Sequence, residues 1–215
     1  PAAAVLGEAA RLVRGAERRR LALAVNTQYA AAAEEYRQLA PEALQAPARF
    51  SAEMTSKLKP DGPRGADICL DLLPHPLSAL LTLLPDAELR PGSVRAAIGA
   101  EGSTVQFQIT VGGRACSAHV RVGKLPQPPF VRSFGLNGQI AQIDVRPDAQ
   151  GVYRGCVRLG GRERVCDDFM KTSIERFCKA ARGEGQPLTG SRAALRQLEL
   201  LLAILEEAQR APRRN

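Results

Sequence analysis

The chain contains no tryptophan, and only 4% of its 215 residues are aromatic. Its core therefore has to be built mainly from leucine, valine, isoleucine and alanine. Hydrophobic residues make up 45% of the sequence, which is enough for a sizeable core and argues against global disorder. The length allows one large domain, or one domain with part of a second.

Metal-ligating residues are scarce. Histidine occurs only twice, at His75 and His119, and the five cysteines include no C-x-x-C pair. An odd cysteine count leaves at least one thiol unpaired, so we expect free thiols, a reducing compartment and a cytoplasmic protein. We expect no zinc or other metal site.

Long apolar runs are also missing. The run ALLTLL (79–84) is far too short to cross a bilayer, and no signal peptide is visible. The net charge is +8, but arginine is scattered except in ERRR (17–20) and RAPRRN (210–215), and aromatic residues are not interleaved with it. We therefore expect neither a membrane nor a nucleic-acid partner.

Three familiar catalytic or nucleotide-binding motifs are absent as well. The chain contains no G-x-G-x-x-G, no P-loop and no G-x-S-x-G. This argues against a phosphate-cradling loop or a hydrolase nucleophile elbow among these residues.

The first 40 residues show a helix–strand–helix (α-β-α) pattern. Apolar spacing predicts an amphipathic helix over 3–19, and the nearly continuous apolar run 21–28 predicts a short buried strand. A second helix is predicted over 29–40, ended by Pro41.

The character of the sequence then changes. A strand is predicted over 48–58, and an apolar helix after residue 65 that is interrupted by Pro74 and Pro76. Short strands separated by turn signals fill 94–166 and predict an antiparallel meander. Helices over 166–183 and 191–210 follow. The predicted fold class is α+β: an open, mostly antiparallel sheet with helices on one face, preceded by the α-β-α unit.

Asp71 and His75 are the candidate site residues. On one helix, residues four apart share a face, and a carboxylate there raises the pKa of an imidazole and can orient it for acid–base work. The purely structural alternative is an acidic residue near a helix end and a partly buried histidine. Asp67 is predicted to be a helix cap or first-turn residue, and strand alternation places His119 on a solvated sheet face.

The order of these segments resembles the glucose–fructose oxidoreductase / inositol dehydrogenase / MocA (Gfo/Idh/MocA) family. Three stretches carry the resemblance: GADICLDLLPHPLSAL (65–80), the opening EAARLVRGAERRRLALAVNTQ (8–28), and the closing AARGEGQPLTGSRAALRQLELLLA (180–203). Family members join a dinucleotide-binding Rossmann domain to a C-terminal α/β domain. The resemblance implies that 1–28 is the tail of the Rossmann-type domain and that 29–215 is the substrate-binding and oligomerisation domain.

The chain departs from the family pattern in three places, one of which is the pair of prolines around His75, Pro74 and Pro76. The Rossmann fingerprint is missing; if Pro1 corresponds to the proline of the family's Glu-Lys-Pro motif, the resemblance implies a preceding nucleotide-binding domain of about 120 residues that carries the motif's lysine. An arginine common after the family's VN-x-Q strand is absent, because this chain reads VNTQYAAAAEEY (25–36).

The resemblance also implies a function for the complete protein and for this chain within it. The chain would be the C-terminal part of a NAD(P)-dependent oxidoreductase acting on a hydroxyl or carbonyl group of a sugar-like or cyclitol-like small molecule. His75 would be the catalytic proton donor or acceptor, with Asp71 beside it. NAD or NADP would be bound by the complete protein and not by this chain alone, which we expect to be inactive by itself.

The alternative is a degenerate, non-enzymatic relative that serves as a dimerisation or partner-binding module. In either case we expect a homo-oligomer formed through the open sheet face. The expectation rests on alternate apolar positions in VRAAIGA (94–100), TVQFQITV (104–111) and GQIAQIDV (138–145).

Overall fold

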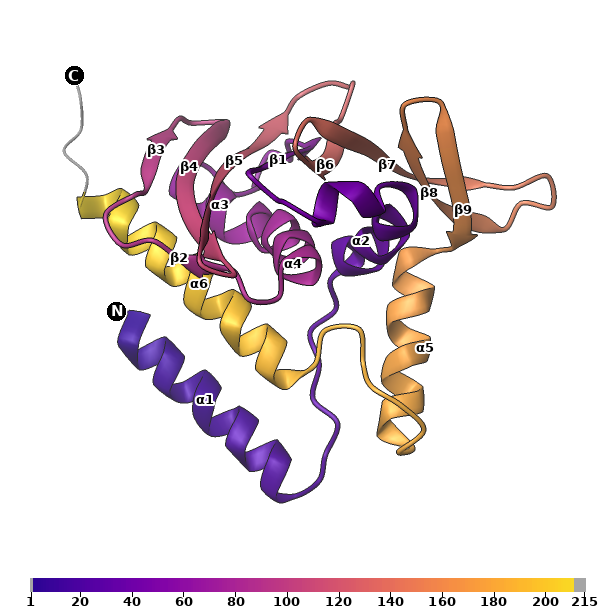
Figure 1. Ribbon diagram of the computed structural model, residues 1–215, viewed down its shortest axis with the longest axis horizontal. Helices are drawn as coiled ribbons and strands as arrows, with labels where there is room; N and C mark the ends of the chain where they lie inside the picture. The colour runs from indigo at the N-terminus through magenta and orange to yellow at the C-terminus, as the bar shows by residue number, and fades with distance from the viewer. Residues whose placement is uncertain (1, 211–215) are drawn as a thin grey trace.

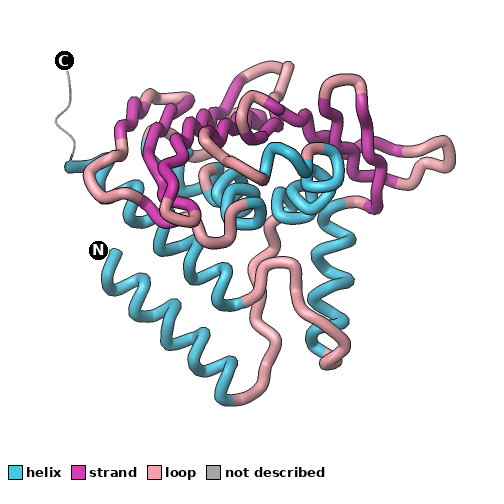
Figure 2. The backbone as a smooth tube through the Cα atoms, viewed as in Figure 1, coloured by secondary structure: helices cyan, strands magenta, loops and turns pink. Residues whose placement is uncertain are grey.

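An open sheet of nine strands forms one layer of the structure, and helices cover one of its faces (Figures 1 and 2). The strands are β1 (Arg49–Lys57), β2 (Glu88–Leu89), β3 (Arg95–Ile98), β4 (Gly102–Val111), β5 (Arg114–Leu125), β6 (Arg132–Leu136), β7 (Gln139–Pro147), β8 (Tyr153–Leu159) and β9 (Arg162–Asp167). The computed structural model describes residues 2–210. Pro1 and most of the basic tail, 211–215, lie outside the described residues.

The sheet is mostly antiparallel, as predicted, but it is not a simple meander. Its order is β2-β4-β5-β1-β6-β7-β8-β9, with β3 also paired to β4. Strand β1 lies between β5 and β6 and runs parallel to β5. This pairing joins residues far apart in sequence, and it brings the ends of β1 and β5 together beneath the helices.

The helices are α1 (Ala2–Arg18), α2 (Gln28–Leu39), α3 (Ala66–Leu72), α4 (Pro74–Leu83), α5 (Phe169–Ala181) and α6 (Ser191–Arg210), with a 3-10 turn, η1, at Pro41–Leu44. Helices α2, α3 and α4 pack against the sheet, α6 packs on α4 and β3, and α1 packs on α6 (Figure 1). The predicted helices are confirmed at these positions.

Residues 21–28 correct the sequence-based prediction, because they form no strand. Residues 21–27 are extended, and Gln28 already begins α2. A backbone bridge joins Ala24 to Gly190 in the loop before α6, and the Leu21 N–H donates to the Ala16 carbonyl in α1. The side chains of Leu21, Leu23 and Val25 are exposed. A short apolar run is compatible both with a buried strand and with an extended surface segment. Only the presence of neighbouring strands distinguishes the two.

The open face of the sheet is also different from the expectation. The apolar positions of β4, namely Val105, Phe107 and Ile109, are buried beneath the helices. The intervening Gln106 and Gln108 are exposed on the other face. Alternation supplies one apolar face per strand, and here the helices already cover it. The apolar positions that suggested an oligomer through the open face are therefore not available on that face. The oligomer stays a prediction.

One buried tyrosine joins the helix layer to the sheet. The Leu136 N–H donates to the Tyr36 hydroxyl at 2.9 Å, and that hydroxyl donates to the Gln139 carbonyl at 2.9 Å. The two bonds fix α2 against the β6–β7 hairpin, where Asn137 and Gly138 have positive φ as a two-residue type I′ turn requires.

Within residues 2–210 no single helix has the length and hydropathy of a membrane span. Only the bent pair α3 and α4, taken together, reaches that threshold by length and composition.

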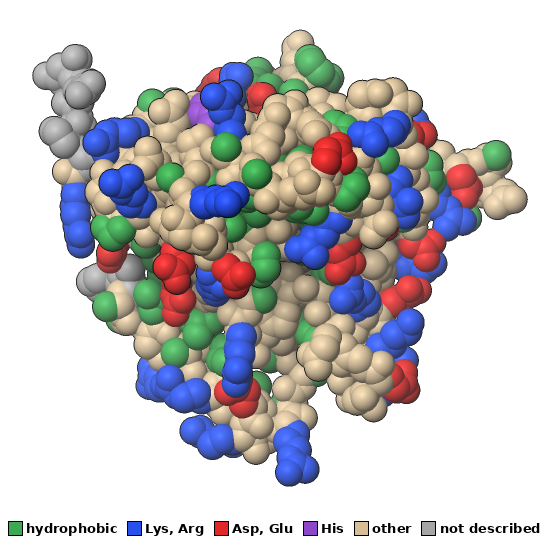
Figure 3. All heavy atoms as spheres, in the orientation of Figure 1, with side chains coloured by type: hydrophobic (Ala, Val, Ile, Leu, Met, Phe, Trp, Pro, Cys, Tyr) green, Lys and Arg blue, Asp and Glu red, His purple; other side chains and the backbone are tan. Residues whose placement is uncertain are grey.

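In the view of Figure 3, basic and acidic side chains are interspersed over the surface rather than gathered into one patch.

Candidate functional site

Two prolines break the helix on which Asp71 and His75 were expected to share a face. Pro74 and Pro76 lack the N–H groups that would continue the hydrogen-bond ladder. The segment therefore divides into α3 and α4, which meet at 45°. Asp71 lies in the last turn of α3 and His75 in the first turn of α4.

Asp71 pairs with Lys124, a residue that no sequence pattern marks as part of a site. The Lys124 Nζ lies 2.6 Å from Asp71 Oδ2, and the lysine side chain is only 14% exposed. Lys124 is near the end of β5, which packs against α3. Asp71 thus holds an ammonium group, and no hydrogen bond joins it to His75 among the described residues.

His75 packs against the first turn of α2. Its ring centroid lies 5.7 Å from that of Tyr29. His75 Nδ1 and the Tyr29 hydroxyl are both buried without a hydrogen-bond partner within the described chain. Such groups lose hydration without replacing it. We call Tyr29, Asp71, His75, Lys124 and Arg132 the His75 cluster; the charge of Arg132 acts on both rings.

Burial sets the protonation state of the two rings. It lowers the pKa of His75 below the ordinary 6.5; the Asp71 carboxylate opposes this, and the Arg132 and Lys124 charges add to it. Burial raises the pKa of the Tyr29 phenol, with Arg132 opposing. At neutral pH the cluster therefore holds a neutral imidazole and a protonated phenol.

Asp67 and His119, which were predicted to lie outside the site, have the places predicted for them. Asp67 is the acidic residue in the first turn of α3. His119 is exposed on the open face of β5, on the side of the sheet opposite His75. Neither belongs to the His75 cluster.

Lys124, Arg132 and Tyr29 could not be identified from sequence alone. Lys124 reaches α3 because β5 packs against that helix, and β5 also pairs in parallel with β1, where Ser56 stands opposite Lys124. Arg132 opens β6 on the other side of β1, opposite Met54. These long-range pairings leave no local sequence signal. Tyr29 stands two residues after Thr27, in the region where the family's arginine was missing.

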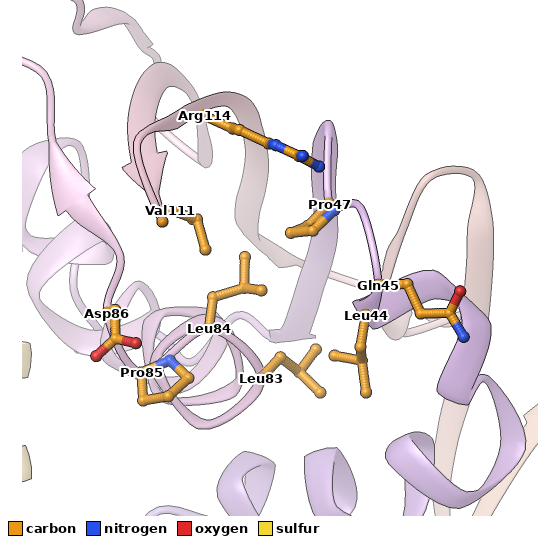
Figure 4. A pocket seen from close by; sticks show the side chains of 10 residues that line it. Leu44, Gln45, Pro47, Leu83, Leu84, Pro85, Asp86, Val111 and Arg114 are labelled. Carbon is orange, nitrogen blue, oxygen red and sulfur yellow. The ribbon is translucent and has the colours of Figure 1, made fainter.

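A separate hollow of about 510 Å³ lies at the opposite end of α4 (Figure 4). Leu83, Leu84 and Val111 are among its apolar side chains, and Asp86 and Arg114 are its charged ones. It contains no member of the His75 cluster and no histidine or cysteine.

The described part of the chain offers no metal centre. No three His, Cys, Asp or Glu side chains in it lie close enough together to hold an ion. All five cysteines are free thiols. Burial raises the pKa of the Cys69 and Cys116 thiols, which disfavours the reactive thiolate.

Comparison with known proteins gives structural matches only. No protein-family model and no curated protein sequence matches the chain. UDP-N-acetylglucosamine 3-dehydrogenase GnnA from Acidithiobacillus ferrooxidans aligns with a TM-score of 0.66 and 22% identity, over 95% of this chain and 67% of that one.

Two further solved structures align similarly. KijD10, a 3-ketoreductase from Actinomadura kijaniata in complex with NADP and TDP-benzene, has a TM-score of 0.62 and 21% identity, over 94% of this chain and 67% of its own. An oxidoreductase from Agrobacterium radiobacter in complex with NAD+, L-tartaric acid and magnesium has a TM-score of 0.61 and 17% identity, over 95% and 68%. The chain spans about two thirds of these proteins and has the α+β fold of their C-terminal domain.

Proposed function

We propose that this chain is the C-terminal, substrate-binding part of a NAD(P)-dependent oxidoreductase of the Gfo/Idh/MocA family. The observation that carries the proposal is the His75 cluster: a mostly buried neutral imidazole beside a lysine–aspartate pair, in a fold shared with sugar oxidoreductases. The substrate would be a sugar, a cyclitol or a sugar nucleotide, whose hydroxyl group is interconverted with a carbonyl group.

His75 is assigned the proton step of that reaction. A neutral imidazole accepts the proton of a substrate hydroxyl as the carbonyl forms, and returns it in the reverse direction. Nδ1 is buried in the cluster, so Nε2 is the nitrogen assigned to the substrate. The two-electron half of the reaction lies outside these residues.

Lys124 and Asp71 are assigned to positioning. Their 2.6 Å ion pair joins the end of β5 to α3. A single residue separates the end of α3 from the start of α4, and His75 lies in the first turn of α4. The two charges act on His75 in opposite directions, so together they adjust its basicity. Asp71 therefore acts through charge, and through Lys124, rather than by a direct bond to the imidazole.

Arg132 is assigned a contact with the substrate. It has no carboxylate partner among the described residues, and it is exposed. A guanidinium there can donate to a hydroxyl or phosphate oxygen of the substrate. Arg132, on β6, would take the place of the arginine that is common in the family near the start of α2 and is absent from this chain.

The described residues do not fit a dinucleotide. Binding the pyrophosphate requires a glycine-rich turn between a strand and a helix, and the turn before α2 reads VNTQ (25–28), without glycine. The cofactor would be held by a separate nucleotide-binding domain, to which 1–28 would belong. The exposed side chains of Leu21, Leu23 and Val25 support a packing partner at that segment.

A non-catalytic partner-binding module remains the second candidate. Exposed apolar residues on α5, Ile174 and Phe177, favour a role in association. Such a module would not need the Lys124–Asp71 ion pair beside His75.

The test is an assay of nicotinamide reduction by the full-length protein. The panel comprises UDP-N-acetylglucosamine, other sugar nucleotides, free sugars and cyclitols, each with NAD+ and NADP+. We expect turnover of at least one member. A full-length protein that binds neither cofactor and turns over no member contradicts the proposal and favours the partner-binding module.

A further inference from the structure

A second polar hollow lies on the open face of the sheet, away from the His75 cluster. Its volume is about 680 Å³, and it is formed by β4, β5, the start of β1 and the loop from residue 90 to 95. The charged or titratable side chains lining it are Arg49, Arg90, Arg95 and His119. The uncharged hydrogen-bonding side chains lining it are Ser93, Gln106, Gln108 and Ser117. No aspartate or glutamate lines it.

Strand register explains why these residues meet. Arg95 pairs with Gln106, and Gln106 pairs with His119, in one row across β3, β4 and β5. In the neighbouring row Gln108 pairs with Ser117, and Ser117 with Arg49, across β4, β5 and β1. Residues in both rows project from the face that the helices leave open.

The wall made by residues 90–95 is held in place. The Glu207 carboxylate on α6 accepts hydrogen bonds from the Gly92 and Val94 N–H groups, at 3.0 and 3.3 Å. The Arg90 guanidinium donates to the Gln108 amide oxygen at 3.1 Å. Glu207 does not line the hollow. Its carboxylate is hydrogen-bonded to the backbone of the loop and does not face the three arginines of the hollow.

The arginines of the hollow lack acidic partners. None of the three forms an ion pair with a carboxylate in the part of the chain that the structure describes. Elsewhere on this face arginines are paired, as in Arg121 with Glu53 at 3.5 Å and Arg146 with Glu163 at 2.8 Å. Three guanidinium groups repel one another unless an anion lies between them.

We propose that this hollow binds a small phosphate-bearing anion. Guanidinium groups bind phosphate oxygens with paired, charge-assisted hydrogen bonds. The serine, glutamine and histidine side chains add donors on the sheet floor. A phosphate offers more acceptor oxygens and more charge than one carboxylate, which matches three cations around one hollow. The site is separate from the proposed active site, since the sheet lies between them.

The test is a titration of this chain with inorganic pyrophosphate at constant ionic strength. Calorimetry measures affinity, and the imidazole NMR signals report which histidine responds. We expect saturable binding that perturbs His119 and not His75. Arg95→Ala and Arg90→Ala should each weaken binding about tenfold or more. Arg158→Ala, an exposed arginine on the same sheet face outside the hollow, is the matched control and should not weaken it.

Three results would overturn the proposal. One is no heat beyond that of sodium chloride at the same ionic strength. Another is an equal loss of affinity in the Arg158 and Arg95 variants, which would indicate general charge attraction. The third is binding of citrate as tight as that of pyrophosphate, which would remove the phosphate assignment. None depends on the oxidoreductase assay, so the two proposals can fail separately.

Discussion

His75→Ala is expected to lower the turnover number of the full-length protein by about 10²- to 10⁴-fold, the usual contribution of a positioned acid–base group. The imidazole is the only histidine side chain on the helix-covered side of the sheet, and burial keeps it neutral at the working pH. Alanine leaves no group at that position to exchange a proton. The measurement is kcat and KM for the best substrate of the panel.

The effect on folding has to be separated from the effect on chemistry. His75 makes no side-chain hydrogen bond through Nδ1, so the variant should unfold at a temperature close to that of the wild type. Asp67→Asn, in the first turn of α3 and outside the cluster, is the control and should retain full turnover. A folded His75→Ala protein with unchanged kcat would remove the acid–base assignment.

Gly135→Ala is expected to lower the free energy of unfolding by about 3 kcal/mol, at the upper end of overpacking costs. A Cβ on Gly135 would collide with the Gln139 backbone carbonyl oxygen and lie 2.9 Å from the Ile140 Cα. Both obstacles are backbone atoms of the paired strand β7, so no side chain can move aside. The β6–β7 hairpin would have to open, which also disturbs the bonds of Tyr36.

Urea denaturation of the chain measures this change. Gly15→Ala is the matched control, because a Cβ on Gly15 meets nothing within 4 Å and its helix, α1, is continuous there. That substitution should raise stability by about 0.5–1 kcal/mol through helix propensity. Equal unfolding midpoints for the Gly135 variant and the wild type would show that the hairpin does not pack as described.

Local patterns in the sequence predicted the local elements well. Apolar spacing located α1, α5 and α6, and Pro41 marked the end of α2. Turn signals separated the short strands, and the tight β6–β7 turn at Asn137-Gly138 is one of these turns. These features depend on residues close together in the chain. The Asp168 carboxylate, which accepts from the Met170 and Lys171 N–H groups at the start of α5, is another such feature.

Non-local features were missed for a physical reason. The position of β1 between β5 and β6 depends on pairing residues about 70 apart, such as Ser56 and Lys124. The packing of α3 on β5, which places Lys124 against Asp71, is equally non-local. The prolines were visible, but the 45° bend between α3 and α4 depends on how the two helices pack against the sheet.

The pH dependence of kcat/KM tests the central claim, that His75 transfers the substrate proton, most directly. In the oxidation direction the neutral imidazole is the active form, so activity should fall on acidification through the pKa of His75, below 6.5. Lys124→Met removes a charge that lowers this pKa, so the inflection should move to higher pH. Asp71→Asn removes a charge that raises it, so the inflection should move to lower pH. An acidic limb at the same pH in the wild type and both variants would contradict the account.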